Sequence, residues 1–493
     1  MQQLSGLDAS FLNMETATTY GHVSGLAIFD PSTAQGDLDL DAVKRLLEER
    51  LHLIPPFRRK LAEVPLGLDH PYWVDDPDFD IDFHVRELAL PAPGTKWQLA
   101  EQVARIVARP LDRRRPLWEL YIITGLEDDY VAQLTKIHHA AIDGASGAEL
   151  MTVLLDMTPE VQPVPPPDGA WRPGPVPSDL QMLGRALVNL ATQPQKAFRM
   201  QRRLLRELPT IARQPGVREL PGVRTAAGIA ARVGGRPAHA EGEVLRRPRT
   251  TAPRVSFNRS ITPHRRFAFD SLSLDDVKAI KNAAGTTVND VVMALCAGGL
   301  RRWLIDHDEL PPNPLVAAIP VSVRTEEQKG ELGNRVSTML APLHTDVADP
   351  VERLRRIHEE TKDAKEAFKA LPADMLQDFA QFATPAVAAR ASRASARLRL
   401  AERLTMPFNL IISNVPGPNF PLYSFGAKLV AQYPVSAVAD GQGLNMTVQS
   451  YMGHLDFGLV ACRELVPDLW DLMDHVGDAL EELKHATLKE QPA

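Results

Sequence analysis

The chain has only two cysteines among 493 residues, Cys296 and Cys462, and both lie in apolar surroundings. This scarcity excludes a disulfide-bonded scaffold and is typical of a protein of a reducing compartment. No window approaches the ~20 uninterrupted apolar residues that a membrane-spanning helix needs. The first residues have neither a basic region nor an apolar core, so we expect no signal peptide. Any contact with a membrane is therefore expected to be peripheral.

An excess of positive charge is also absent. The net charge of −7 argues against a nucleic-acid partner, and no zinc-finger spacing is present. A P-loop, a GxGxxG after a strand, an HExxH and a GxSxG elbow are missing as well. What remains is a globular composition, with 44% apolar and 24% charged residues. A chain of this length predicts two domains of roughly 200 residues.

The composition shifts sharply at Val161, where a proline-rich stretch begins. Such a stretch is stiff and extended, so it predicts a linker between two packed units. We therefore divide the chain into an N-terminal unit of residues 1–160, a Pro/Arg-rich linker of residues 161–255 and a C-terminal unit of residues 256–493.

Residues 183–213 of this linker combine a helix-like apolar side with strong positive charge. Seven basic residues stand against one acid, Glu207. The basic residues are Arg185, Lys196, Arg199, Arg202, Arg203, Arg206 and Arg213. Two interpretations are open: the segment lies on an anionic lipid surface, or it packs across the two units.

Hydrophobic periodicity predicts strands and helices in both units. In the N-terminal unit we expect a strand at 22–29, helices at 40–51 and 99–107, and a hairpin of 118–126 with 130–138. In the C-terminal unit we expect a strand at 265–269, helices from 274 and 288, and strands at 315–324 and 336–343. The chain closes with a hairpin of 444–451 and 454–462 around Met452-Gly453, followed by an amphipathic helix from 469.

Two adjacent histidines end the second strand of the N-terminal hairpin, in the sequence His138-His139-x-x-x-Asp143-Gly144. Side chains alternate between the faces of a strand, so the two rings cannot point into the same cavity. One histidine is therefore expected to be structural and the other available for chemistry. A capping-box pattern at 146–149 predicts a helix directly after the motif. Side chains at such strand ends reach clefts while the scaffold stays rigid.

Several chemistries compete for this motif. A metal site is disfavoured because adjacent histidines on a strand diverge, and a serine triad lacks its elbow. A pair of structural histidines and a general base for a hydroxyl both remain open. Asp143 could bond the imidazole or pair with an arginine elsewhere; Arg324, which ends a buried strand, is a candidate for pairing with a buried carboxylate. Asp290 has capping-box spacing from Thr287, so a helix cap is its simplest role.

HHxxxDG is the signature of the acyl-CoA-dependent acyltransferase superfamily, which includes chloramphenicol acetyltransferase, carnitine acyltransferases and peptide-synthetase condensation domains. Beyond this motif, the whole chain resembles the bacterial wax ester synthase/diacylglycerol acyltransferase family, particularly its actinobacterial members. The stretches that carry the resemblance are Leu4-Ser5-Gly6-Leu7-Asp8-Ala9, Pro116-Leu117-Trp118, Val288-Asn289-Asp290, Pro320-Val321-Ser322-Val323-Arg324 and Ser413-Asn414-Val415-Pro416-Gly417-Pro418. They match in order and spacing over nearly the full length, and residues 173–253 match least.

The resemblance implies an α/β fold of two chloramphenicol-acetyltransferase-like subdomains. Each would be a mixed sheet with helices, and the two would face each other across a substrate tunnel. The implied enzyme is an acyl-CoA-dependent O-acyltransferase that esterifies diacylglycerol to triacylglycerol, and in the family often also long-chain alcohols to wax esters. Acyl-CoA would be a substrate, so no cofactor and no metal are expected.

The resemblance also implies roles for individual residues. His139 would be the general base that deprotonates the acceptor hydroxyl, with His138 in support. Asp143 would be mainly structural and pair with Arg324, while Gly144 lets the strand turn into its helix. Asn289 and Asp290 match a second motif that is implicated in the same site.

The implied substrates reside in bilayers or lipid bodies. We therefore expect a cytoplasmic protein that associates peripherally with the inner face of the membrane or with lipid bodies. Two alternatives stay open: a non-catalytic lipid-binding protein of lipid bodies, and an acyltransferase that acts on polyketide-type or peptide-type acceptors.

Overall fold

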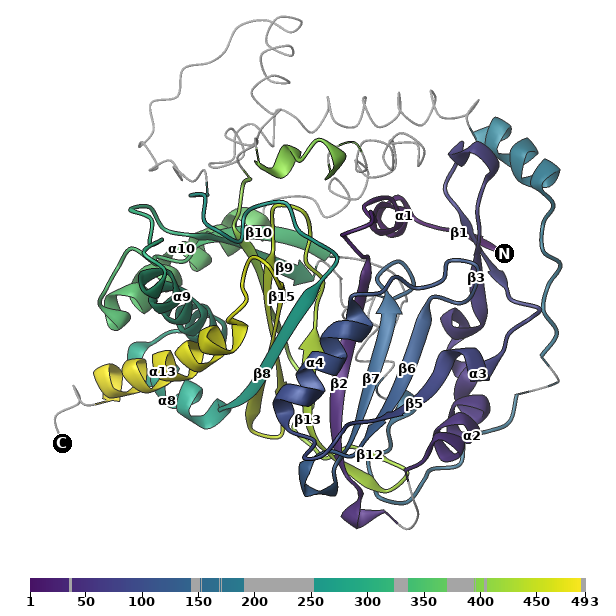
Figure 1. The fold of residues 1–493 in the computed structure, drawn as a ribbon, viewed down its shortest axis with the longest axis horizontal. Helices are drawn as coiled ribbons and strands as arrows, with labels where there is room; N and C mark the ends of the chain where they lie inside the picture. Colours follow the sequence, from purple (N-terminus) through teal and green to yellow (C-terminus); the bar gives the residue numbers. More distant parts are fainter. Residues whose placement is uncertain are drawn as a thin grey trace, which may run out of the picture.

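The computed structural model describes residues 1–34, 38–142, 151, 153–167, 169, 171–189, 252–322, 336–369, 394, 396–402 and 406–488. Two six-stranded sheets stand side by side in this part of the chain, and helices cover their outer faces (Figure 1). A small third sheet joins β1 (Gln2–Gln3), β4 (Tyr72–Asp75) and β3 (Arg59–Ala62). The predicted α/β class is confirmed.

The first large sheet holds the histidine motif. Its strand order is β12 (Tyr423–Ser424), β13 (Ala427–Val435), β2 (His22–Asp30), β7 (Val131–His138), β6 (Trp118–Thr124) and β5 (Val85–Ala89). Strands β6 and β7 form the predicted hairpin, and β2 pairs antiparallel with β7 so that His22 lies opposite His138. The motif is thus at the end of a central strand.

The second large sheet is formed by the C-terminal part of the chain. Its strand order is β10 (Val336–Pro342), β9 (Val316–Ser322), β11 (Leu410–Val415), β14 (Leu444–Tyr451), β15 (His454–Cys462) and β8 (Arg265–Ser273). The predicted turn of the β14–β15 hairpin is confirmed at Met452 and Gly453, with φ values of 45° and 85°. Two successive positive φ values are typical of the tight turns that join antiparallel strands.

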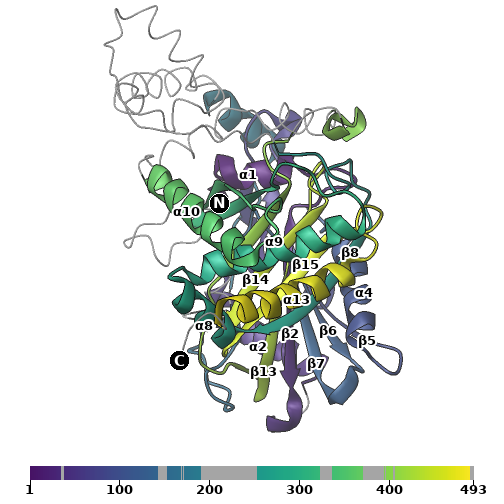
Figure 2. The same cartoon turned by 90° about the vertical axis from the view of Figure 1, so that its left-hand side faces the viewer.

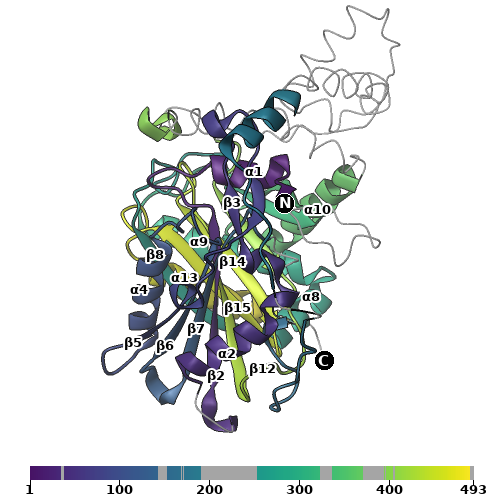
Figure 3. The same cartoon turned by 90° about the vertical axis from the view of Figure 1, so that its right-hand side faces the viewer.

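Helices α8 (Leu274–Ala284), α9 (Val288–Asp306), α10 (Pro350–Lys369) and α13 (Leu469–Leu488) cover the outer face of the second sheet (Figure 2). Helices α2 (Leu40–Arg50) and α3 (Ile81–His84) lie on the opposite side of the molecule, against the first sheet (both in Figure 1, α2 also in Figure 3). The short helix α1 (Gly6–Asn13) lies close to the end of β7, since Phe11 contacts His139. Helix α9 is largely buried, because residues on all its sides belong to one apolar core.

Helix α4 (Lys96–Val107) lies between the two large sheets. It begins at a capping box of Thr95 and Gln98, and its apolar face packs on Phe267 and Phe269 of β8. The carbonyls at its C-terminal end accept hydrogen bonds from two buried side chains. Lys136 Nζ donates to Ile106 O at 3.3 Å and to Arg109 O at 2.7 Å, and His22 Nε2 lies 2.9 Å from Val107 O. The ammonium group of Lys136 is favourable at this position because a helix C-terminus is negative.

The boundary predicted at residue 255 does not separate the two sheets. Strands β12 and β13 belong to the predicted C-terminal unit, yet they complete the first sheet, where Lys428 pairs with Asp30. The sheets also approach each other closely: a Cβ on Gly458 of β15 would lie 1.8 Å from Pro434 O of β13. A division of the chain at a single boundary cannot predict that β12 and β13 join the first sheet, because strand pairing is not encoded locally in the sequence.

No single helix in the described ranges has the length and apolar character needed to cross a membrane. The bent pair α8 and α9, with 105° between them, meets the test by length and composition only.

Candidate active site

Backbone hydrogen bonds fix both histidines at the end of β7. His138 N–H donates to Leu117 O at 2.9 Å, and His139 N–H donates to Gly21 O at 2.8 Å. The chain then turns, since Ala141 N–H donates back to His138 O at 2.9 Å. The Pro-Leu-Trp stretch of the sequence therefore supports the motif through the backbone of Leu117.

His138 is enclosed, with 1% of its surface exposed. Its Nδ1 accepts a hydrogen bond from Ala140 N–H at 3.0 Å, so the proton of the neutral ring is on Nε2. Nε2 lies 3.2 Å from Glu15 Oε1. The ring is thus held between a carboxylate and the backbone immediately after His139.

Glu15 is itself held by two further groups. Arg113 donates to Glu15 Oε2 from Nε at 3.0 Å and from Nη2 at 2.6 Å, and Gly21 N–H donates to Oε1 at 2.9 Å. Burial favours the neutral acid, but His138, Arg113 and the Gly21 amide outweigh it and lower the pKa of Glu15 to about 2. Glu15 is therefore a carboxylate at neutral pH.

A glycine is required where the chain passes His138. A Cβ on Gly21 would lie 2.6 Å from His138 Nε2 and 3.0 Å from Phe11 O. The neighbouring His22 is buried, and burial together with nearby Lys136 holds its pKa well below the ordinary range. His22 is therefore neutral and serves to fix α4.

His139 has different surroundings from His138. It is partly exposed, and its ring stacks on Phe11 of α1 with 4.4 Å between centroids and 5° between planes. One histidine is thus enclosed and its neighbour partly exposed, while their roles stay predictions. The stacking and the fixed backbone together limit the orientations that the His139 ring can adopt.

Three predicted residues of the motif region, Asp143, Gly144 and Arg324, lie outside the described residues. The pairing of Asp143 with Arg324 therefore stays a prediction.

Asp290 makes its contacts on α9 and α10. It forms the predicted capping box with Thr287, and its carboxylate accepts from His358 Nδ1 and Thr361 Oγ1, both at 2.7 Å. Burial would raise the pKa of Asp290, but His358, Thr361 and Thr287 together lower it. In the described part of the chain these bonds tie two helices together and do not reach His138. Asn289, beside it, is partly exposed on the first turn of α9.

Sequence reasoning missed Phe11, Glu15, Gly21 and Arg113. All four lie outside the stretches that carry the family resemblance, and nothing in the local pattern joins Glu15 to Arg113 across 98 positions. Within the described ranges, no group of three or more His, Cys, Asp or Glu residues is arranged to hold a metal ion.

Two family models match this chain. Residues 4–292 match the wax ester synthase/diacylglycerol acyltransferase catalytic domain, and residues 332–484 match the C-terminal domain of the same family. A Mycobacterium tuberculosis protein provisionally named as a diacylglycerol O-acyltransferase is 38% identical over 488 residues, which are 98% of this chain and 90% of the relative. A probable diacylglycerol O-acyltransferase of that species, tgs2, is 36% identical over 97% of this chain and 98% of its own length.

Solved structures agree. The wax ester synthase/diacylglycerol acyltransferase from Marinobacter aquaeolei VT8 is 31% identical, with a TM-score of 0.66 over 99% of this chain and 100% of that one. The starter condensation domain of rhizomide synthetase, at 12% identity, has the same fold with a TM-score of 0.54 over 99% and 94% of the two chains. The chain thus belongs to the wax ester synthase/diacylglycerol acyltransferase family of acyltransferases, as its sequence resemblance predicts.

Proposed function

We propose that this chain transfers the acyl group of an acyl-CoA to the hydroxyl of diacylglycerol, with His139 as the general base. The different surroundings of the two histidines carry this proposal. His138 is enclosed and both its nitrogens face protein groups, so it cannot meet a substrate. His139 is partly exposed, and its backbone and ring are both held in place.

In the proposed reaction, a nitrogen of His139 takes the proton of the acceptor hydroxyl. The oxygen attacks the thioester carbonyl, the C–O bond forms and the C–S bond breaks. The leaving thiolate of CoA then receives the proton from the imidazolium, so the base is regenerated. Proton transfer of this kind contributes typically 10²–10⁴-fold to the rate.

The test is release of CoA from palmitoyl-CoA and diacylglycerol by His139→Ala. We expect a loss of at least ~10²-fold with an unchanged fold. His485→Ala is the matched control, because His485 is exposed on α13 and its Nδ1 faces Glu481 O of the same helix. Undiminished CoA release by His139→Ala would refute the assignment. A wild-type protein that binds lipid without turnover would instead favour the lipid-binding alternative.

A competition assay between two acceptors identifies the preferred one. One acyl-CoA offered diacylglycerol and hexadecanol together is expected to give mainly triacylglycerol, with wax ester as the lesser product on thin-layer separation. Wax ester as the main product would refute the assignment of diacylglycerol.

We also propose that the helix at residues 179–189 faces a lipid surface. Its inner side packs Met182 and Ala186 on Val64 and Tyr72. Its outer side presents Leu180 and Leu187, which are 80% and 60% exposed. Seven positions separate these two residues, so they share one face of the helix.

Flotation with anionic liposomes tests this surface. Changing both Leu180 and Leu187 to Glu should abolish flotation, because an apolar stripe is what inserts at the interface. The control is Ile305→Glu, because Ile305 is also an exposed apolar residue but lies on a different helix, α9. Unchanged flotation of the double variant would contradict the proposal.

A further inference from the structure

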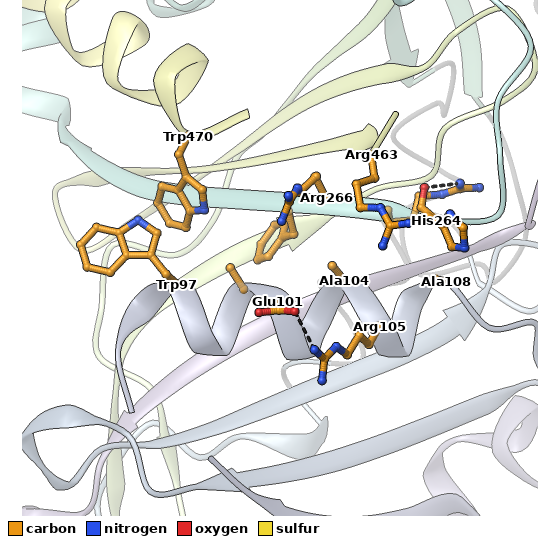
Figure 4. A pocket seen from close by; sticks show the side chains of 12 residues that line it. Trp97, Glu101, Ala104, Arg105, Ala108, His264, Arg266, Arg463 and Trp470 are labelled. Carbon is orange, nitrogen blue, oxygen red and sulfur yellow. Dashed lines mark hydrogen bonds and ion pairs between the residues drawn. The ribbon is translucent and has the colours of Figure 1, made fainter. Parts of the chain in front are cut away.

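A cleft of about 260 Å³ lies between α4 and β8, where the two halves of the chain meet (Figure 4). Helix α4 supplies Trp97, Glu101 and Arg105 on one side of the cleft. The other side is formed by Arg266 of β8 together with Arg463 and Trp470. The wall formed by α4 is fixed in advance, because Lys136 and His22 bond the carbonyls at its C-terminal end. We name this space the α4–β8 cleft.

One end of the cleft is strongly basic. Arg105, Arg266 and Arg463 line this end from three different segments (Figure 4). Arg266 has no ion-pair partner within the part of the chain that the structure describes. Arg105 pairs with Glu101 at 2.6 Å, but both side chains are more than half exposed, so this pair is weak. Arg463 pairs with Glu464 at 3.1 Å and contacts His264 Nδ1 at 3.0 Å, but both charged side chains are more than a third exposed, so this pair is weak as well. A phosphate can therefore compete for these three guanidinium groups.

The other end of the cleft is aromatic. Trp97 and Trp470 form a tilted pair with 5.8 Å between ring centroids, and Trp97 is 55% exposed. Eight residues of α4 separate Trp97 from Arg105, which corresponds to about 12 Å along the helix axis. An exposed indole is a platform on which a flat base can stack.

A series of contacts links the basic end to the histidine motif. Arg265 lines the α4–β8 cleft and also a second, very small cavity beside Tyr20 and His22. Its guanidinium donates to Thr18 O and lies 5.2 Å from the centroid of the Tyr20 ring. Gly21 follows, and its carbonyl accepts from His139 N–H. Two residues of the chain, Tyr20 and Gly21, thus connect Arg265 to His139.

We propose that the α4–β8 cleft binds the phosphorylated nucleotide end of the acyl-CoA. The adenine lies on Trp97 and Trp470, the phosphates are held by Arg105, Arg266 and Arg463, and the pantetheine arm runs past Arg265 toward His139. The order of aromatic end, basic end and motif matches the order of adenine, phosphates and thioester along CoA. This proposal rests on the proposed function, since it places the donor substrate of that reaction.

The direct test is calorimetric titration of the full-length protein with CoA. Arg266→Glu should weaken binding by roughly tenfold or more, because a charge-assisted contact is replaced by repulsion. Arg463→Glu should act in the same direction. Lys278→Glu is the charge-matched control, because Lys278 is exposed on α8 and pairs with Asp275 of the same helix. Unchanged CoA affinity in both arginine variants would overturn the proposal.

The parts of the ligand can be tested separately. Removing the 3′-phosphate, with dephospho-CoA as the probe, should weaken binding to the wild type but much less to Arg266→Glu. Pantetheine should bind the wild type and the arginine variants equally. Trp97→Ala should weaken CoA binding and leave pantetheine binding unaffected. Equal losses for CoA and pantetheine would mean that the substitutions disturb the fold, and they would overturn the assignment of the nucleotide.

Kinetics distinguish this proposal from the reaction itself. In Arg266→Glu the KM for palmitoyl-CoA should rise while kcat at saturation stays within twofold, and the KM for palmitoyl-pantetheine should not change. A protein that binds CoA in an Arg266-dependent manner but transfers no acyl group would refute the proposed function and leave the cleft assigned. A protein that transfers the acyl group with the same KM in every variant would support the proposed function and refute the assignment of the cleft.

Discussion

Two networks in this molecule pair a carboxylate with a histidine, but their burial is inverted. At the end of β7, the enclosed group is His138, and Glu15 connects it to the more exposed Arg113. At the start of α9, the enclosed group is Asp290, and its partner His358 is 31% exposed. The first network fixes the backbone beside an accessible histidine, whereas the second joins two helices. The same pair of residue types therefore serves positioning in one place and stability in the other.

The largest effect should come from crowding the first network. Gly21→Ala places a methyl group 2.6 Å from His138 Nε2, so the ring and the following backbone must shift. A misplacement of about 1 Å can cost ~10²-fold, and we expect a loss of that order in kcat/KM. Gly477→Ala on α13 is the control, because a Cβ there meets nothing within 4 Å. Steady-state kinetics of both variants provide the measurement, and an active Gly21→Ala would contradict this view of His138.

Asp290→Ala should act on stability instead. It leaves His358 and Thr361 without their acceptor, and removing one partner of a buried pair costs about 3–5 kcal/mol. Activity per folded molecule should stay within about threefold of the wild type, in contrast to Gly21→Ala. Urea unfolding together with kinetics separates the two effects. A stable but inactive variant would place Asp290 in the chemistry.

The first network should also contribute acid sensitivity. The pKa of Glu15 is lowered from 4.5 to about 2, so its pairing stabilises the fold fully above pH 4.5 and is lost as pH falls toward 2. A shift of this size corresponds to about 3 kcal/mol. The difference in unfolding free energy between wild type and Glu15→Gln should therefore shrink across that window. A difference that does not vary with pH would show that Glu15 is not paired as described.

The smallest effect is expected for the exposed member of the second network. His358→Gln removes one hydrogen bond to Asp290 while Thr361 and Thr287 remain. The expected cost is about 1 kcal/mol, with no change in kcat. Thermal unfolding of His358→Gln and His138→Gln completes the comparison. The loss of stability should be greater in His138→Gln, because His138 is the enclosed histidine. Equal losses would remove the distinction between the two networks.

Features encoded within a few residues were predictable from the sequence. The capping box of Thr287 and Asp290 and the Met452-Gly453 turn each depend on near neighbours along the chain, and each is confirmed. The family resemblance supplied the fold, which local patterns alone could not have specified.

Contacts between distant segments were not predictable. Glu15 meets Arg113 through a network spanning almost one hundred positions, and no periodicity encodes that pairing. The exchange of β13 into the first sheet likewise depends on which of several strand edges it joins. Hydrophobic patterning specifies which face of a strand is buried, but it does not specify the neighbouring strand.

The pairing of β2 with β13 has a consequence for synthesis of the chain. Strand β2 ends at Asp30, but the partner that covers its edge extends to Val435, about 400 residues later. At a typical translation rate of roughly 5–20 residues per second, that edge waits on the order of 20–80 s for its partner. An unpaired strand edge is a template for aggregation. The first sheet of this protein therefore cannot mature until most of the second has been made, and the nascent chain is expected to depend on chaperones during that interval.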